Sequence, residues 1–330
     1  MTGRLAAIDL GSNTIRLLVA DADPARGLRL VHQEQVVARL GQGLARTGLL
    51  APEAMERALA AVRAYRDRAR ALGAERVIVV ATAAVRQAGN RDEFLGRLAA
   101  EPDLRPRVAT GDEEARLTLL GVASALPPLG DAYAVLDIGG GSTELIVARG
   151  ARYVDAVSLD LGVVPLAERF LHADPVDWAE YSACAGHVAE RLASDAWAEI
   201  RPLRPRLLVG TAGTITTLAA LDLGLAAYDA SRVQGHRLAV ARIEALLYRL
   251  GALHVAERAR LPALEPGRAD LIIPGIAITL AALEGLGLAE LIVSDSGLRE
   301  GILLDAIGWS SQLPRSRPFA RLAAGVVACD

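Results

Sequence analysis

The sequence predicts an α/β protein built from two related halves that face each other across a cleft. The main observation is a repeated strand–turn–strand pattern, whose copies are Asp9-Leu10-Gly11-Ser12-Asn13-Thr14 and Asp137-Ile138-Gly139-Gly140-Gly141-Ser142-Thr143-Glu144, roughly 128 residues apart. In each copy an apolar run enters the turn and another leaves it. The second observation is that strand patterns alternate with helix patterns along the rest of the chain.

The first half contains the first hairpin and then alternating elements. Apolar residues at helical spacing predict a helix that opens at Pro52 and ends at Gly73. Thr110-Gly111-Asp112-Glu113 has the spacing of a capping box, in which Glu113 is the partner of Thr110, and it predicts a helix over 112–125. The other expected elements are a strand with a return over 28–40, a buried strand over 76–81, a helix over 91–99 and a short strand over 107–109. The break Pro127-Pro128-Leu129-Gly130 is the predicted boundary between the halves.

The second half repeats the pattern, starting from the second hairpin. A buried strand over 207–209 leads into Gly210-Thr211-Ala212-Gly213-Thr214 and a helix, a third glycine turn that aims a helix N-terminus at the cleft. The other expected elements are a strand over 153–158, a helix over 164–172, a long helical stretch over 175–199, a strand over 291–293 and a helix over 298–307. From Trp309 onward we expect a tail.

Composition narrows the classes of protein. The chain has 330 residues, 52% of them apolar, with no uninterrupted apolar run of 18 or more, so we expect no membrane span. The chain enters a strand almost at once, so no signal peptide is expected. Two cysteines, Cys184 and Cys329, cannot make a disulfide framework or a four-ligand zinc site. We therefore expect a soluble, cytoplasmic protein, and a homodimer is one candidate for its oligomeric state.

The charges exclude two kinds of phosphate binding. A net charge of −3 argues against a nucleic-acid-binding protein. All 36 basic residues are arginine, and the missing lysine excludes a Walker A loop. The glycine turns remain, because their glycines expose backbone N–H groups, their Ser and Thr residues add hydroxyl donors, and each turn has a carboxylate left over for a cation. Any phosphate-binding cation must then be a guanidinium.

Eight motifs in order resemble one family. They are Asp9-x-Gly-Ser-Asn-Thr14; Ala81-Thr-Ala-Ala-Val-Arg86 with Asn90-Arg91 and Phe94-Leu95; Gly111-Asp-Glu-Glu-Ala115; Asp137-Ile-Gly-Gly-Gly-Ser-Thr-Glu144; Gly210-Thr-Ala-Gly-Thr214; Gly235-His-Arg237; Arg268-Ala-Asp270 with Pro274-Gly275; and Ser294-Asp-Ser-Gly-Leu-Arg-Glu-Gly301. Over about residues 4–308 they resemble the exopolyphosphatase / guanosine pentaphosphate phosphohydrolase (Ppx/GppA) family. One departure is Pro165, where many relatives have an arginine.

The resemblance implies a two-lobed, actin-like fold of the ribonuclease H-like type, with a duplicated mixed sheet and the active site between the lobes. It implies that lobe I comprises about residues 1–125 plus 300–330 and lobe II about 126–299, without the additional helical domain of longer relatives. The helix after Gly297 is expected to cross back to lobe I.

The resemblance also implies the roles of individual residues. Glu114 matches the catalytic glutamate that activates water, and a helix N-terminus should keep its carboxylate ionised near neutral pH. Asp137 and Glu144 are expected to hold Mg²⁺, with Glu144 also positioning the water, and Asp9 is a third candidate metal ligand. The expected phosphate-binding residues are Gly11, Ser12, Asn13, Thr14, Arg86, Gly139, Gly140, Gly141, Ser142, Thr143, Gly210, Thr211, Gly213 and Thr214. Arg268, Arg299 and His236 are weaker candidates.

The expected activity is Mg²⁺-dependent release of terminal phosphate from inorganic polyphosphate. The alternative is removal of the 5′ γ-phosphate of guanosine pentaphosphate, because the reacting group is the same. An actin-like sugar kinase or chaperone-like ATPase would need an acceptor pocket with its own catalytic Asp, which we do not find. A nucleotide-binding, filament-forming regulator without turnover would leave the Glu114 motif unexplained. A dinucleotide-dependent oxidoreductase would need a Gly-x-Gly-x-x-Gly turn.

Overall fold

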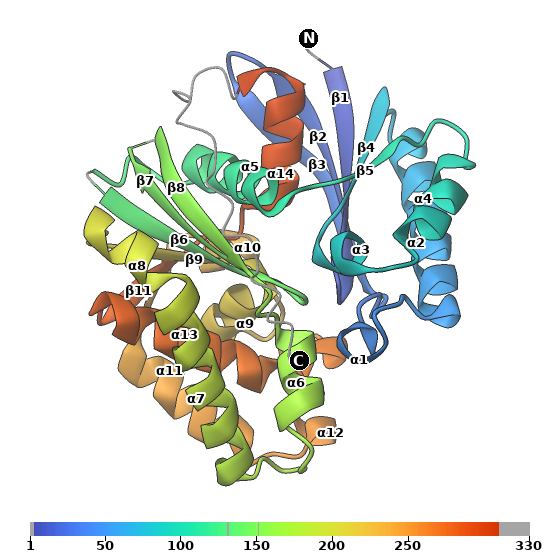
Figure 1. Cartoon of the computed structure of the whole chain (residues 1–330). Coiled ribbons are helices and arrows are strands. Elements are labelled where there is room, and N and C mark those ends of the chain that lie inside the picture. The colour runs from blue at the N-terminus through green and yellow to red at the C-terminus, as the bar shows by residue number, and fades with distance from the viewer. Residues whose placement is uncertain (1–2, 131, 151, 310–330) are drawn as a thin grey trace, which may run out of the picture.

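The computed structural model describes residues 3–130, 132–150 and 152–309, which form two lobes with one mixed β-sheet each (Figure 1). The predicted tail beyond Trp309, the expected 310–330 segment of lobe I and Cys329 lie outside the described residues. Among the helices within them, none is long and apolar enough to cross a membrane.

The first sheet, five strands within the described residues, has the order β3-β2-β1-β4-β5. Strand β1 pairs antiparallel with β2 and parallel with β4. Its strands are β1 (Gly3–Leu10), β2 (Thr14–Asp23), β3 (Gly27–Val37), β4 (Arg76–Ala81) and β5 (Pro106–Val108), and the associated helices are α1 (Leu44–Thr47), α2 (Pro52–Ala71), α3 (Ala83–Gln87) and α4 (Arg91–Ala99). Because side chains alternate along β1, Ile8 packs into a core shared with α2, whereas Ala7 packs on the opposite face with α14 (Leu298–Ala306).

The second sheet repeats this order as β8-β7-β6-β9-β11, with β10 added at the edge. Strand β6 pairs antiparallel with β7 and parallel with β9, as β1 does with β2 and β4. The strands are β6 (Ala132–Ile138), β7 (Thr143–Arg149), β8 (Arg152–Leu159), β9 (Leu208–Thr211), β10 (Arg237–Ala239) and β11 (Glu290–Val293). The repeated order confirms the predicted α/β fold with a duplicated mixed sheet.

Helices cover both faces of the second sheet. On one face, a large apolar core connects the sheet to a group of helices that includes α7, α11 and α13, which lie together in Figure 1. On the other face, α5 packs against the sheet. These helices are α5 (Gly111–Ala125), α6 (Val163–Phe170), α7 (Trp178–Asp195), α8 (Trp197–Ile200), α9 (Ala212–Asp222), α10 (Ala230–Val233), α11 (Val240–Gly251), α12 (Val255–Arg258) and α13 (Ile272–Leu286), with short 3₁₀ turns at Arg201–Leu203 and Pro266–Arg268. Helices α5 and α14 pack against each other between the two sheets, so they join the lobes.

Most elements lie where the sequence predicts them, with two differences. The single helical stretch expected over 175–199 is wrong, because it divides at Ala196 into α7 and α8. Elements without a counterpart among the predicted ones are the helices α1, α3, α10, α11, α12 and α13 and the strand β10.

Candidate functional site

The two glycine turns have the same backbone geometry. In the first, the Gly11 N–H donates to the carbonyl of Thr14 at 3.2 Å; in the second, the Gly139 N–H donates to that of Ser142 at 2.9 Å. A β-carbon at Gly11 or Gly139 would lie 2.8 or 2.9 Å from the same carbonyl oxygen. Both turns therefore require glycine at this position. Without side chains at these glycines, the backbone N–H groups of the turns remain accessible from the cleft.

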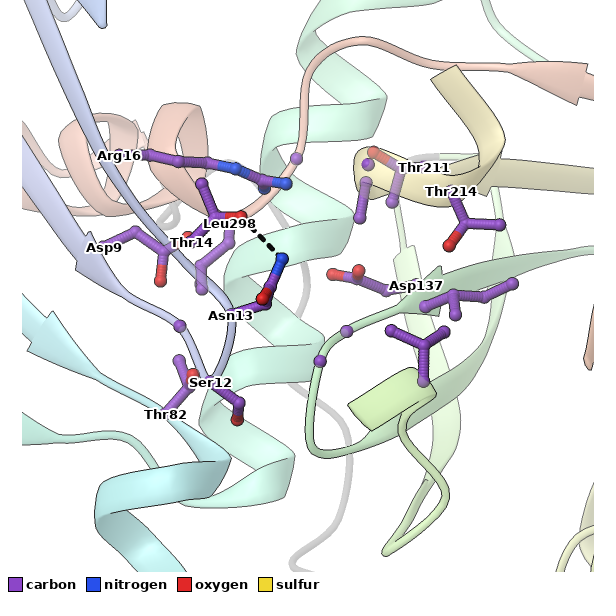
Figure 2. Close-up of a pocket in the computed structure, with 18 of the residues that line it drawn as sticks. Asp9, Ser12, Asn13, Thr14, Arg16, Thr82, Asp137, Thr211, Thr214 and Leu298 are labelled. Atoms are coloured by element: carbon purple, nitrogen blue, oxygen red, sulfur yellow. Dashed lines mark hydrogen bonds between the residues drawn. The ribbon is translucent and has the colours of Figure 1, made fainter. Parts of the chain in front are cut away.

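The turns also touch each other across the cleft. A β-carbon built on Gly140 would lie 2.9 Å from the backbone nitrogen of Asn13, and one on Gly141 would lie 2.4 Å from Ser12 Oγ. Figure 2 shows Ser12 and Asn13 on one side of the pocket and Asp137 on the other. Of the predicted residues, the structure brings together around this pocket Asp9, Gly11, Ser12, Asn13, Thr14, Glu114, Asp137, Gly139, Gly140, Gly141, Ser142, Thr211, Gly213 and Thr214.

The third glycine turn closes another side of the pocket. Strand β9 ends at Thr211, and Ala212, with a left-handed φ of 66°, turns the chain into α9. The position of a β-carbon on Gly213 lies 2.4 Å from Arg268 Nη1, so the Arg268 guanidinium lies directly against this glycine. The N-terminus of α9 thus meets the pocket with a cation beside it, an arrangement suited to an anion.

Several buried carboxylates gather at the cleft. Asp9 and Asp137 are 6% and 8% exposed, and Thr118 Oγ1 donates to Asp137 Oδ2 at 2.9 Å. Burial raises the pKa of Asp9 to about 6 and also raises the pKa of Asp137. Within the described residues, Asp9 Oδ1, Ser12 Oγ and Asn13 Oδ1 are buried without a hydrogen-bond partner. Such unpaired polar atoms beside a cavity indicate a site for a polar ligand.

Glu114 lies at the start of α5 and is 7% exposed. Arg86 Nη1 donates to Glu114 Oε2 at 2.7 Å and to the carbonyl of Ala109 at 3.0 Å. Burial raises the pKa of Glu114 to about 7, against the influence of Arg86 and with that of Asp137 and Asp9. The expectation of a fully ionised carboxylate near neutral pH is corrected, because desolvation outweighs the helix N-terminus and a pKa of about 7 leaves the group only partly ionised there.

The capping box at this helix is half formed. Thr110 Oγ1 accepts from the Glu113 N–H at 3.1 Å, as predicted. The Glu113 carboxylate, however, pairs with Arg107 instead of reaching back to Thr110. The predicted partnership is wrong for the Glu113 side chain, because a charged partner on the neighbouring strand is within its reach.

Four predicted residues do not line the pocket. Arg86 is held by Glu114, and Thr143 Oγ1 donates to the carbonyl of Leu161 at 2.5 Å. Gly210 packs against the side chain of Ile215, because a β-carbon there would lie 2.9 Å from Ile215 Cγ2. Glu144, 1% exposed, accepts from Ser158 Oγ at 2.8 Å, and burial together with the nearby Glu114 and Asp137 raises its pKa well above the usual value.

The pocket also contains cations that sequence reasoning missed or ranked low. Arg16 faces Asp9 across the β1–β2 register, and its guanidinium reaches over the pocket in Figure 2. Arg268 and Arg299 line the same pocket. The missed signal for Arg16 was the repeat itself, because Glu144 faces Asp137 at the matching position of the second hairpin. His236 lies elsewhere, paired with Asp222 at 2.8 Å.

Comparisons with known proteins point to one group. The chain matches the model of the Ppx/GppA phosphatase family over residues 18–308. It is 41% identical over 318 residues to exopolyphosphatase 2 of Mycobacterium tuberculosis, which covers 92% of this chain and 99% of that protein. Among solved structures, the Aquifex aeolicus Ppx/GppA family member is 33% identical with a TM-score of 0.78, covering 93% of this chain and 98% of that one. An exopolyphosphatase from Cytophaga hutchinsonii is 27% identical with a TM-score of 0.86, covering 92% and 98%.

Proposed function

Because the chain belongs to the Ppx/GppA phosphatase family, we propose that it is a Mg²⁺-dependent phosphohydrolase that releases terminal phosphate from inorganic polyphosphate. The exopolyphosphatase names of two relatives support this substrate. The observation that carries the proposal is the meeting of the two glycine turns around a small pocket that Glu114 and Asp137 also line.

The pocket suits the end of a phosphate chain. Its volume is about 100 Å³, against about 470 Å³ for the cavity that adjoins it. We propose that the pocket holds a terminal phosphoryl group with an attacking water. Backbone N–H groups of the turns and the hydroxyls of Ser12, Ser142 and Thr214 are the proposed donors to the phosphoryl oxygens.

The residues present fit Mg²⁺. Among the described residues, no three His, Cys, Asp or Glu side chains are gathered as a ready-made metal centre. Mg²⁺ does not require one, because it is usually held by one or two carboxylates together with waters and substrate phosphates. Asp9, with its unpaired Oδ1, and Asp137 are the proposed ligands. When bound, the ion would neutralise charge on the phosphoryl oxygens.

Glu114 is the proposed general base. A base works best with a pKa near the operating pH, and about 7 meets that condition. Arg86 holds one carboxylate oxygen, which leaves the other to accept a proton from water. Glu144 does not line the pocket, so we propose that it supports Glu114 from behind the pocket wall, where Ser158 holds its buried carboxyl group in place.

A second candidate substrate is guanosine pentaphosphate. The observation that favours it is a cavity of about 470 Å³ that adjoins the phosphate pocket and is large enough for a nucleoside. The chemistry at the terminal phosphoryl group would be the same, so the two candidates differ in what the larger cavity binds.

The test is phosphate release, with Mg²⁺, from tripolyphosphate, long-chain polyphosphate and guanosine pentaphosphate. Glu114→Gln should lower kcat by about 10²–10⁴-fold, the usual contribution of a general base. Glu113→Gln is the matched control, since that carboxylate faces Arg107 on the neighbouring strand. A Glu114→Gln enzyme with near-parent rates, or a parent that releases phosphate from none of these substrates, would refute the proposal.

A further inference from the structure

A second cavity continues from the phosphate pocket. It has a volume of about 470 Å³ and shares five lining residues with the smaller pocket: Arg16, Ala212, Arg268, Asp295 and Arg299. Because the same side chains line both spaces, a linear substrate whose end occupies the smaller pocket would extend into this one. The rest of such a substrate would therefore lie in the second cavity.

Three guanidinium groups mark the junction of the two spaces. Arg16 comes from β2, Arg268 from the turn before α13, and Arg299 from the start of α14, so both lobes contribute. Burial lowers the pKa of Arg268 to about 10, which leaves it charged at neutral pH. Arginine can hold two phosphate oxygens at once, so this junction suits the phosphoryl groups directly behind the terminal one.

Beyond the junction the sign of the charge changes. Among the described residues that line only the second cavity, no cation occurs, whereas Glu34 and Glu265 contribute carboxylates. Asp295 adds a third carboxylate at the junction itself. Glu265 accepts from Gln35 Nε2, and its Oε2 lies 3.9 Å from Arg268 Nε. Asp295 accepts from the Tyr228 hydroxyl. These carboxylates repel the negatively charged phosphoryl groups, so binding becomes less favourable as a longer chain extends past the arginines.

We propose that the carboxylates of the second cavity, above all Glu265, limit the substrate to short phosphate chains. This inference rests on the proposed polyphosphate hydrolysis and adds a chain-length limit to it. The arginines bind the first few phosphoryl groups, and the acidic wall disfavours a chain that continues past them. Glu265 is then a specificity-determining residue that touches no reacting atom.

The test compares kcat/KM per chain end for tripolyphosphate, tetrapolyphosphate and long-chain polyphosphate. For the parent, the value for long chains should be lower than that for tripolyphosphate by about tenfold or more, because the carboxylates of the second cavity repel the additional phosphoryl groups. Glu265→Gln keeps an oxygen that can accept from Gln35 and removes the charge, so it should raise the ratio of long-chain to tripolyphosphate values several-fold. Glu257→Gln, a neutralised carboxylate in α12 that lines neither cavity, should leave the ratio unchanged.

The possible failures are distinguishable. Equal parent values for long chains and tripolyphosphate would overturn the chain-length limit while leaving the hydrolase intact. A ratio that responds equally to Glu265→Gln and Glu257→Gln would overturn the role of Glu265, because it would show a general charge effect. Absence of phosphate release from every linear polyphosphate would overturn the proposed function and this inference together.

Discussion

The crossing of α5 and α14 gives a sharp test of how the lobes are joined. A β-carbon at Gly301 of α14 would lie 1.8 Å from the carbonyl oxygen of Leu117 in α5 and 2.5 Å from its carbonyl carbon. Both are backbone atoms, so no side chain can rotate away and the helices would have to separate by more than about 1 Å. Gly301→Ala should therefore disturb the packing that joins the two sheets.

The magnitude follows from two opposing effects. Overpacking a dense contact costs about 1–3 kcal/mol, and a rigid backbone contact should lie at the upper end. Replacing a helical glycine by alanine returns about 1 kcal/mol. We expect a net loss of about 2 kcal/mol in the free energy of unfolding, which lowers Tm by ~3 °C in a protein of this size. Because Glu114 lies one turn before Leu117, kcat should fall as well.

The assay is thermal and urea unfolding followed by circular dichroism, alongside phosphate release. Gly96→Ala in α4 is the matched control: it is also a helical glycine, but it is exposed and a β-carbon there meets nothing within 4 Å. That variant should gain about 0.5–1 kcal/mol. If Gly301→Ala were as stable as Gly96→Ala, the described closeness of the two helices would be wrong.

Three further predictions concern the site and the closure of the lobes. Arg86→Gln removes the 2.7 Å contact that lowers the pKa of Glu114, so that pKa should rise above about 7. The acidic limb of the kcat–pH profile should then move to higher pH. An unchanged limb would show that Glu114 is not the general base. Chelation with EDTA should abolish phosphate release and added Mg²⁺ should restore it, while Asp137→Asn should require more Mg²⁺ for half-maximal rate; metal-independent turnover in the parent would contradict both expectations. Arg39→Ala removes a bidentate contact between the lobes, in which Nη1 and Nη2 of Arg39 donate to Asp270 at 2.7 and 3.0 Å. It should raise KM several-fold and lower the free energy of unfolding by about 1 kcal/mol or less, as expected for a partly exposed pair. Steady-state kinetics and Tm measure the two effects, and an unchanged KM would argue against a role of Arg39 in closing the lobes.

Local patterns predicted the parts of the fold that carry their own signal. The hairpins on either side of Gly11 and Gly139 were predictable because each turn is closed by a bond between residues three apart. Helix α13 was not, because it is buried among other helices and apolar on nearly every side, so it lacks the periodicity that identifies a helix at the surface. Pro274 also suggests a break, yet it stands at the third position of α13, where its missing N–H has no helical partner to lose.

The site divides in the same way. The glycine turns and Glu114 belong to motifs a few residues long, and the structure places them around one pocket. The motif of Arg86 pointed to the residue but not to its partner, because its contact with Glu114 joins residues 28 positions apart. The burial of Glu114 likewise depends on the tertiary structure, which is why its raised pKa could not be predicted from its place at a helix N-terminus.

The duplication explains how one backbone arrangement serves two chemical tasks. Asp9 and Asp137 hold equivalent positions beside equivalent turns, but the residue opposite them is Arg16 in the first hairpin and Glu144 in the second. Lobe I therefore adds a cation that faces the second cavity, and lobe II adds a carboxylate near Glu114. In the proposed complex, the inner phosphoryl groups would lie beside arginine and the terminal group beside acids, with Mg²⁺ neutralising the charge between them. Replacing the first of these residues by the second, with Arg16→Glu, should abolish substrate binding, because Arg16 lies at the junction that the phosphate chain would cross. The Tm should change much less than the affinity for the substrate.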